Sequence, residues 1–430
     1  MSTSIMLFTR DLRVRDNPAL AAACEAGRVV PVFVFDEAIL GGPFAVPNRL
    51  RFLLESLADL RGSLRELGGN LVVAHGDPVA EVGRLAERTR AGTLFIADER
   101  SAFATRRLAG LRRLGLDVSV HPGITVVPPG DLTPASGDHY RVFTPYWRAW
   151  EAARWRPVAD VPEKVRLPSG VKVGSLPRLA DLTSGSPSPE LAPGGEGKGR
   201  ERLEAWLGQD ATAYDDVHDD LAADRTSRLS AYLKFGCVSP RELAESGPDA
   251  FRRQLAWRDF HHQVAAAFPA LPKEDYRPRD QGWNDAEDAL AAWCDGMTGV
   301  PIVDAGMRQL HREGFMHNRA RLITASYLTR HLGIDWRDGL RHFGDWLTDG
   351  DIADNAGNWQ WVAGTGNSTR PDQVMNPLRQ ASRFDPSGDY VRRYVRELAG
   401  IEGSRVHRPW TLPEAQRRTL DYPQPILLPE

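Results

Sequence analysis

Residues 349–361 carry the segment Asp349-Gly350-Asp351-Ile352-Ala353-Asp354-Asn355-Ala356-Gly357-Asn358-Trp359-Gln360-Trp361, in which three aspartates and two tryptophans fall within thirteen residues. The simplest interpretation is a helix start, with Asp349 or Asp351 as the cap and both indoles packed in a core. A surface helix explains the acids and a core helix explains the indoles. Both together indicate a cavity with polar walls and an aromatic lining, which is typical of a ligand site.

Helical signals dominate on both sides of this segment, from about residue 200 onward. Helices are predicted at Glu201–Leu207, Arg228–Phe235, Ala250–Phe268, Ala286–Cys294, Val300–Glu313 and Met316–Leu332. Tryptophan is frequent in the same half, at Trp257, Trp283, Trp293, Trp336, Trp346, Trp359, Trp361 and Trp410. Core packing explains any single indole, but a series of indoles can also carry an electron to a buried redox cofactor. Residues 200–430 are therefore predicted to form an all-helical domain.

The first 125 residues alternate short apolar runs with helical segments, which predicts a doubly wound parallel α/β sheet. Strands are expected at Ile5–Phe8, Val29–Phe35, Asn70–Ala74, Thr93–Ala97 and Leu116–Val120. Helices are expected from Pro18, at Pro47–Leu67, at Pro78–Arg90 and at Ala102–Leu114. Neither GxGxxG after the first strand nor GxxxxGK[ST] occurs, so a dinucleotide held on a Gly-rich turn is excluded. A ligand is expected at the carboxyl ends of the strands.

Residues 126–199 are predicted to connect the two domains. Proline, glycine and serine are frequent from Arg156 onward, which is typical of an extended connector on the surface. No internal repeat is found.

Composition indicates an ordinary globular protein, with 42% hydrophobic and 26% charged residues. No leader sequence and no run long enough to span a bilayer is found, so a cytoplasmic protein is expected, without a membrane partner and as a monomer. Cys24, Cys237 and Cys294 lie far apart and lack CxxC spacing. Neither a disulfide framework nor a metal site is therefore expected.

Three further segments are polar in ways that suit a ligand. Residues 224–230 precede a helix and offer hydroxyls and backbone N–H groups, which indicates either a pyrophosphate cradle or an N-cap cluster. Helical spacing places Gln254, Trp257 and Arg258 on one face. Residues 316–321 group a histidine, an asparagine and two arginines, of which Arg321 is expected to pair with Asp349 or Asp351.

Seven segments together resemble the photolyase/cryptochrome family, in family order and spacing. They are TSRLS (226–230), YLKFG (232–236), QLAWRDF (254–260), TGVPIVDAGMRQL (298–310), GFMHNRARLITAS (314–326), IDWR (334–337) and DGDIADNAGNWQW (349–361). With the α/β region, the resemblance covers nearly the whole chain and is most similar to bacterial cyclobutane pyrimidine dimer photolyases. It implies an antenna-binding α/β domain at 1–125, a connector at 126–199 and a helical FAD- and DNA-binding domain at 200–430.

The resemblance also assigns roles near FAD. Asp349 and Asp351 would contact the isoalloxazine and ribityl region, Arg321 would pair with the first acid, and Asn355 would face flavin N5. The phosphates and ribose would be held by Tyr214, Thr226, Ser227, Arg228, Leu229 and Ser230. Trp359, Trp336 and Trp283 match the electron-relay triad, from the inner to the outer member.

The implied activity is light-driven repair of cyclobutane pyrimidine dimers in DNA, by electron transfer from excited reduced FAD. The implied contacts to DNA or to the lesion are Trp257, Trp361, Gln254, Arg258, Asn318, Arg319, Leu322 and Gln380. Enzymes for the (6-4) photoproduct carry a histidine pair at the positions of Asn318 and Leu322. Since neither residue can shuttle protons, cyclobutane dimers are the expected substrate.

Two departures leave an alternative open. Gln254 stands where many dimer photolyases have a glutamate, and it carries no charge and transfers no proton. Asp354 stands where the family has a small or amide residue, and an ionised carboxylate there would disfavour an anionic reduced flavin. A cryptochrome-like blue-light photoreceptor without repair activity is therefore the alternative.

A second, antenna chromophore is expected in the α/β domain. Lys234 matches a lysine that contacts deazaflavin in some family members, and Glu99 falls near another such contact. Deazaflavin is favoured over folate, and a flavin antenna or no antenna at all also remain open.

Overall fold

The computed structural model describes residues 2–209, 211–280 and 282–428. The chain forms two compact units. Unit 1 comprises Met1–Ser186, Ala192–Thr212 and Ser227–Pro269, and unit 2 comprises Pro187–Leu191, Ala213–Thr226 and Ala270–Glu430. The functional division at 1–125, 126–199 and 200–430 stays a prediction.

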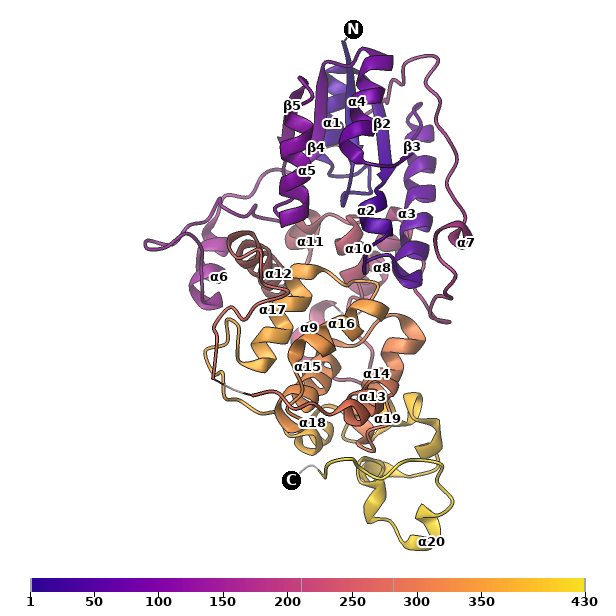
Figure 1. The fold of residues 1–430 in the computed structure, drawn as a ribbon, viewed down its shortest axis with the longest axis vertical. Helices are drawn as coiled ribbons and strands as arrows, with labels where there is room; N and C mark the ends of the chain where they lie inside the picture. The colour runs from indigo at the N-terminus through magenta and orange to yellow at the C-terminus, as the bar shows by residue number, and fades with distance from the viewer. Residues whose placement is uncertain (1, 210, 281, 429–430) are drawn as a thin grey trace. The chain divides into compact units, whose positions relative to one another are not determined.

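Unit 1 is built on a five-stranded parallel sheet with the strand order β3-β2-β1-β4-β5 (Figure 1). Its strands are β1 Ser2–Phe8, β2 Gly27–Phe35, β3 Val72–His75, β4 Thr93–Ala97 and β5 Asp117–His121. Five consecutive residues of β1 and seven of β2 are buried, as expected for parallel strands covered on both faces. The order reverses between β1 and β4, so the loops after these two strands flank a topological switch point. The predicted doubly wound sheet is confirmed.

Four helices of unit 1 begin where the sequence predicts them, at Pro18, Pro47, Pro78 and Ala102, and the others were not predicted or begin at another residue. The helices of unit 1 are α1 Pro18–Glu25, α2 Glu37–Leu40, α3 Pro47–Glu66, α4 Pro78–Thr89, α5 Ala102–Arg112, α6 Phe143–Ala152, α7 Leu179–Leu182, α8 Glu196–Gln209, α10 Ser230–Phe235, α11 Pro240–Ser246 and α12 Asp249–Ala267. Asn17 and Asp77 cap α1 and α4 with side-chain oxygens, and each of these helices starts with proline.

A buried carboxylate attaches α12 to unit 1. Asp259 accepts hydrogen bonds from the backbone N–H groups of Val126 and Val127, at 2.9 and 3.0 Å, and from Trp150 Nε1 at 2.9 Å. Burial raises the pKa of this carboxyl, and the three donors act against that shift. The bonds hold the start of the connector and helix α6 against α12.

All regular secondary structure in the described residues of unit 2 is helical. Its α-helices are α9 Tyr214–Val217, α13 Glu287–Asp295, α14 Pro301–Glu313, α15 Asn318–Ser326, α16 Trp336–Trp346, α17 Ile352–Ala363, α18 Pro377–Phe384, α19 Asp389–Tyr394 and α20 Glu414–Arg417. One apolar core joins most of them and includes Trp293, Trp336 and Trp359, each at most 2% exposed. The single helix predicted at Met316–Leu332 is wrong in one respect, because α15 ends at Ser326 and a π-helical turn follows at Tyr327–His331.

Two imidazoles lie together beside this core. The Nε2 atoms of His311 and His342 are 3.4 Å apart, and the His311 ring packs on Trp346 with centroids 4.4 Å apart. Burial lowers the pKa of His342 from 6.5 to about 4, and His311 contributes to the shift. His342 is therefore neutral in the folded protein at pH 7.

We expect this pair to make the protein less stable in mild acid. The unfolded chain binds a proton at His342 below pH 6.5 and the folded chain does so only near pH 4, so stability is lost as the pH falls between these values. At pH 5, protonation of His342 in the unfolded chain lowers the free energy of unfolding by about 2 kcal/mol relative to pH 7. Urea unfolding at pH 7 and pH 5 measures it, and the His342→Gln variant should lose that part of the pH dependence. An unchanged dependence in the variant contradicts the assignment.

Candidate functional site

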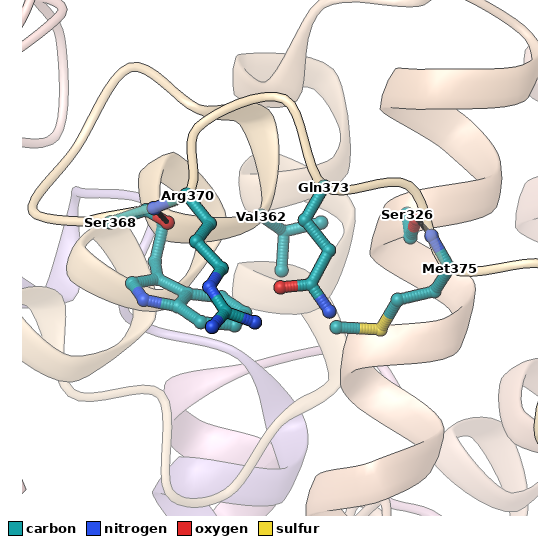
Figure 2. Close-up of a pocket in the computed structure, with 7 residues that line it drawn as sticks. Ser326, Val362, Ser368, Arg370, Gln373 and Met375 are labelled. Carbon is teal, nitrogen blue, oxygen red and sulfur yellow. Dashed lines mark hydrogen bonds between the residues drawn. The ribbon is translucent and has the colours of Figure 1, made fainter.

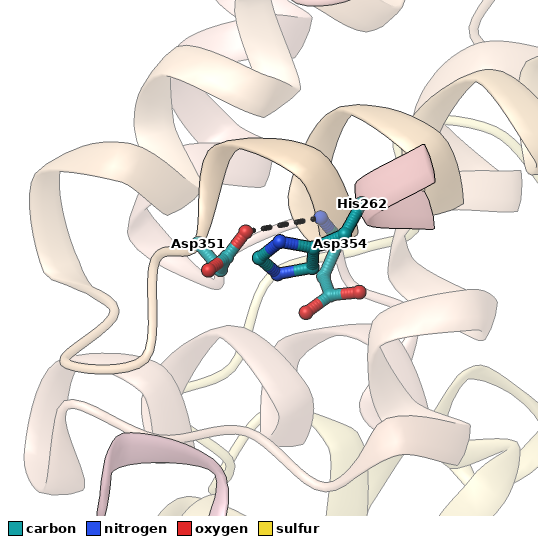
Figure 3. Close-up of side chains that lie close together, drawn as sticks. All are labelled: His262, Asp351 and Asp354. Carbon is teal, nitrogen blue, oxygen red and sulfur yellow. Dashed lines mark hydrogen bonds between the residues drawn. The ribbon is translucent and has the colours of Figure 1, made fainter. Parts of the chain in front are cut away.

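The segment 349–361 forms the entry and the first turns of α17. Asp351 caps the helix, since its Oδ1 accepts from the N–H groups of Ala353 and Asp354 at 3.0 and 3.4 Å. Figure 3 shows the second of these bonds. Asp351 is 4% exposed, so the cap is buried. The cap predicted for this segment is confirmed for Asp351.

Asp349, two residues earlier, forms a different contact. Its two carboxylate oxygens accept from Arg321 Nη1 and Nη2 at 3.1 and 2.8 Å, which is a bidentate pair. Arg321 is fixed in turn because its Nε donates to the Met316 carbonyl at 2.8 Å. Its guanidinium also lies 5.6 Å from the centre of the Phe315 ring. The expected partnership of Arg321 with an acid of the segment is therefore present.

Asn355 and Asp354 lie on the first turn of α17, and both side chains are half-buried. The Asn355 N–H donates to the Asp351 carbonyl at 2.9 Å, which is the first bond of the helix. Its amide can both donate and accept hydrogen bonds. The roles predicted for Asn355 and Asp354 beside a flavin stay predictions.

The three predicted relay tryptophans differ in burial. Trp359 is 2% and Trp336 0% exposed, whereas Trp283 is half-buried at the edge of the same core. Trp336 Nε1 donates to Asp275 Oδ1 at 2.9 Å. A set of two buried indoles and one partly exposed indole is what a path between the interior and solvent requires. Electron transfer through them stays a prediction.

Glycine 339 lets Trp359 approach the backbone of α16. A Cβ built at Gly339 lies 2.1 Å from Cη2 of Trp359 and 2.7 Å from Leu328 Cδ2, so any side chain here overlaps the indole. Gly339 is one turn after Trp336 on the same helix, so both residues share one helical face.

The Gly339→Ala variant is accordingly expected to destabilise the protein by about 1–3 kcal/mol, as overpacking in a core does. Gly344→Ala is the matched control in the same helix, because a Cβ there meets nothing within 4 Å. It should be neutral or stabilising by up to about 1 kcal/mol. Urea unfolding measures both variants, and equal stability of the two contradicts the packing described.

Trp361 is half-buried and lines a small pocket. Figure 2 shows the pocket, whose other lining residues are Ser326, Val362, Ser368, Arg370, Gln373 and Met375. Sequence reasoning missed Arg370 and Gln373. The run of glycine, asparagine and proline at 364–372 is a loop signal that could have indicated them, since loops often carry function.

The other predicted lesion contacts of unit 2 have varied surroundings. Asn318 is exposed, and Leu322 is half-buried against the core. Arg319 Nε and Nη2 donate to the two carboxylate oxygens of Asp219 at 3.1 and 2.5 Å. The Arg319 guanidinium also lies 4.3 Å from the centre of the Phe384 ring. Gln380 is half-buried, and its Oε1 has no hydrogen-bond partner among the described residues. Of these, Arg319 already has an internal partner.

The predicted contacts on α12 belong to unit 1. Gln254 is exposed, and Trp257 stacks on Phe143 with ring centroids 3.7 Å apart and an interplanar angle of 7°. Arg258 is 8% exposed and its Nη1 donates to the Ile124 carbonyl at 2.7 Å. The DNA-binding role predicted for Arg258 stays a prediction, and its observed contact is within unit 1.

The predicted phosphate-binding residues span the chain where it passes between the units. Tyr214 and Thr226 belong to unit 2, and the residues 227–230 belong to unit 1. Tyr214 is buried, and its ring stacks on that of His218 with centroids 5.1 Å apart. Burial raises the pKa of its hydroxyl. Arg228 adopts a left-handed conformation, with φ of 51°, so helix α10 starts at Ser230 and not at Arg228 as predicted. Thr226, Ser227 and Leu229 lie outside the helices, and Ser230 is the first residue of α10.

The two predicted antenna residues are brought together by Arg10. Arg10 follows β1, Glu99 follows β4, and both loops flank the switch point of the sheet. Arg10 Nη1 donates to Glu99 Oε1 at 3.4 Å, and Arg10 Nε donates to the Lys234 carbonyl at 3.0 Å. Arg107 also binds Glu99, at 3.2 Å. This is the edge at which a doubly wound sheet binds its ligand.

Comparisons with known proteins identify two ranges of the chain. Residues 4–165 match the model of the DNA photolyase family, and residues 251–428 match the model described as the FAD binding domain of DNA photolyase. The deoxyribodipyrimidine photo-lyase of Streptomyces griseus is 49% identical, over 99% of this chain and 96% of its own. Cryptochrome DASH of Natronomonas pharaonis is 35% identical, over 99% of this chain and 98% of its own. A crystal structure of a bacterial class III photolyase from Agrobacterium tumefaciens has a TM-score of 0.90 at 34% identity, covering 100% of this chain and 95% of that one.

The chain belongs to the DNA photolyase/cryptochrome family. The family, the photolyase enzyme class and the fold predicted from the sequence are thereby confirmed. A helical FAD-binding domain is confirmed as well. Its matched range contains Arg321, Asp349, Asp351 and Asn355, whereas Tyr214 and residues 226–230 precede it.

The residues of this photolyase-family site fit a flavin in their chemistry. Asp349 and Asp351 are buried acceptors, and a carboxylate can accept more hydrogen bonds than the pair with Arg321 uses. Asn355 adds an amide that donates or accepts.

The family membership predicts DNA as the macromolecule on which the chain acts. Among residues 2–209, 211–280 and 282–428, no helix is both long enough and apolar enough to cross a bilayer.

Proposed function

We propose that this photolyase-family chain repairs cyclobutane pyrimidine dimers in DNA, using FAD and blue light. The observation that carries the proposal is the arrangement on α17. An acid fixed by Arg321 precedes the helix, Asn355 lies on its first turn, Trp359 enters the core and Trp361 lines a surface pocket. Bound FAD, when reduced and excited by light, supplies the electron that splits the cyclobutane ring.

The residues of the chain would orient the reactants. Asp349, held by Arg321, and Asp351 would accept from N–H and hydroxyl groups of the cofactor, and Asn355 would hold a hydrogen bond at the flavin nitrogen that gains or loses a proton. Phosphates and ribose would be bound by the segment from Thr226 to Ser230 with Tyr214. Trp359, Trp336 and Trp283 would pass an electron from solvent to an oxidised cofactor. The splitting of the dimer itself consumes no electron, since the electron returns from the split dimer.

The lesion would be bound outside the duplex. A dimer has lost part of its stacking, so it costs less to extrude than an intact base pair. By the family resemblance, Trp257 of unit 1 and Trp361 of unit 2 would each offer it an aromatic face. Gln254, Asn318, Leu322 and Gln380 would contribute polar and apolar contacts. The half-buried Trp361 offers such a surface, and Arg370 beside it supplies positive charge for a phosphate.

The test is an illuminated repair assay with the purified holoprotein. DNA with one cyclobutane dimer and DNA with one (6-4) photoproduct are exposed to blue light, and restored bases are counted by chromatography. We expect repair of the dimer only. Recovery of the (6-4) lesion alone overturns the substrate assignment.

A cryptochrome-like photoreceptor is the second candidate, and two observations favour it. Gln254 is exposed and uncharged where many repair enzymes have a glutamate, and a relative named Cryptochrome DASH is 35% identical over nearly the full length. A holoprotein that photoreduces its flavin and leaves both lesions intact supports this candidate.

We also propose a deazaflavin antenna at the loops after β1 and β4. The supporting observation is the hydrogen bonding of Arg10 to both Glu99 and the Lys234 backbone at the switch point of the sheet. The absorption spectrum of the holoprotein tests it. A second visible band besides that of FAD, lost on replacing Glu99, is expected, and a spectrum of FAD alone refutes it.

A further inference from the structure

The indole N–H of Trp336 has a charged partner inside a helical core. Trp336 is fully buried at the first turn of α16, and its Nε1 donates to Asp275 Oδ1 at 2.9 Å. Arg337 Nη2 donates to the same oxygen at 2.8 Å. The Asp275 side chain is 18% exposed, so water screens its charge only in part. Burying a carboxylate is costly, and the hydrogen bonds from Trp336 and Arg337 offset part of that cost.

The charges around this indole do not cancel. The Arg337 guanidinium lies 4.5 Å from the Trp336 ring centre, and it also pairs with Asp335 at 3.1 Å and donates to the Lys273 carbonyl at 2.7 Å. Two carboxylates and one guanidinium give a local charge of −1 (−1 −1 +1). A net negative charge at this distance stabilises positive charge on the ring.

Trp359 is in ring contact with another indole, Trp293, whose surroundings differ from those of Trp336. Trp293 is fully buried, and its ring centre lies 6.0 Å from that of Trp359 at an angle of 72°. Its Nε1 donates to the carbonyl of Thr324 at 3.0 Å, which is a neutral acceptor. The ring contact of Trp359 is with Trp293, while Trp336 lies in the same core and shares a helical face with Gly339, which packs on the Trp359 indole. The carboxylate is the feature that distinguishes Trp336 from Trp293.

We propose that Asp275 is a positioning residue that directs electron transfer through Trp336, and this inference rests on the relay in the proposed function. The oxidant is the photoexcited, oxidised flavin, which takes one electron from Trp359. One electron then moves from Trp336 to Trp359, so Trp359 is restored and the positive charge resides on Trp336, beside Asp275. The carboxylate lowers the free energy of this state and not of the corresponding state on Trp293. An external thiol finally supplies the electron that restores the relay.

The test compares variants of the holoprotein by photoreduction of its flavin and by transient absorption of tryptophan radicals. Asp275→Asn keeps an oxygen acceptor and removes the charge, and we expect photoreduction to slow about tenfold. Arg337→Gln removes the opposing cation and is expected to act with the opposite sign. Asp338→Asn is the matched control, because this carboxylate pairs with the exposed Arg341 on the same helix. It should leave the rate unchanged.

A structural readout independent of light accompanies these rates. In the ¹⁵N-indole NMR spectrum, the signal absent from Trp336→Phe belongs to Trp336 Nε1–H, and it should shift in Asp275→Asn while the other indoles stay in place. A wild-type rate in Asp275→Asn, with slow photoreduction in Trp336→Phe, overturns the role of Asp275 alone. Wild-type photoreduction in Trp336→Phe overturns the relay of the proposed function. Slowing in both Asp275→Asn and Arg337→Gln indicates loss of structure and also overturns the proposal.

Discussion

Replacing Asp349 by alanine is expected to lower the free energy of unfolding by about 3 kcal/mol, because it leaves Arg321 without its buried partner. The carboxylate side chain is only 5% exposed and binds both terminal nitrogens of Arg321. The same substitution removes an acceptor proposed to contact the flavin, so FAD affinity should fall by at least about tenfold, the effect of one lost charge-assisted hydrogen bond. Urea unfolding of the flavin-free protein and a flavin-fluorescence titration measure the two effects.

A surface ion pair provides the matched control for stability. Asp338 and Arg341 pair on the exposed side of α16, with side-chain exposures of 31% and 68%. Asp338→Ala should cost less than about 1 kcal/mol, since exposed pairs contribute little. Equal losses in Asp338→Ala and Asp349→Ala contradict the importance given to the buried pair.

A double variant separates stability from binding. Replacing Asp349 by leucine and Arg321 by methionine removes both charges together, and such an exchange is often close to neutral for stability. We expect this variant to unfold near the wild-type urea concentration and still to bind FAD weakly. Wild-type FAD affinity in the double variant shows that Asp349 acts only on the fold.

The elements near the start of α17 were predictable because their determinants are local. Asp351 accepts from the N–H groups two and three residues later, and the spacing of an acid, a cap and two indoles is visible in thirteen residues. The strands were predictable for the same reason, since buried parallel strands require continuous apolar runs. β2, predicted at Val29–Phe35, extends over Gly27–Phe35.

Other features depend on contacts between residues far apart in the chain. Helix α12 joins unit 1 through Asp259, whose partners lie 109 to 133 residues earlier. The carboxylate on Trp336 comes from Asp275, 61 residues before it. Neither partner differs in sequence from an ordinary surface aspartate. The same holds for Arg258, whose helical face was predicted and whose partner, the Ile124 carbonyl, was not.

Replacing Trp361 by alanine is expected to weaken binding of dimer-containing DNA about tenfold or more, because stacking of a base on an aromatic ring contributes about 1–3 kcal/mol. Trp361 is half-buried and lines the pocket that also contains Arg370 and Gln373. An electrophoretic mobility or anisotropy titration in the dark, with damaged and undamaged duplexes of one sequence, measures the effect.

The comparison between the two duplexes identifies the contact. A wall for an extruded lesion touches only the damaged duplex, so affinity for undamaged DNA should stay within about twofold, as expected when phosphate contacts alone provide it. Trp361→Phe keeps an aromatic face and should retain most of the affinity. Trp359→Phe, in the core, should slow photoreduction and leave DNA binding unchanged. If Trp361→Ala weakens binding of both duplexes equally, the indole supports the pocket loop and is not in contact with the lesion. The proposed division of roles between these two tryptophans, two residues apart on one helix, would then be wrong.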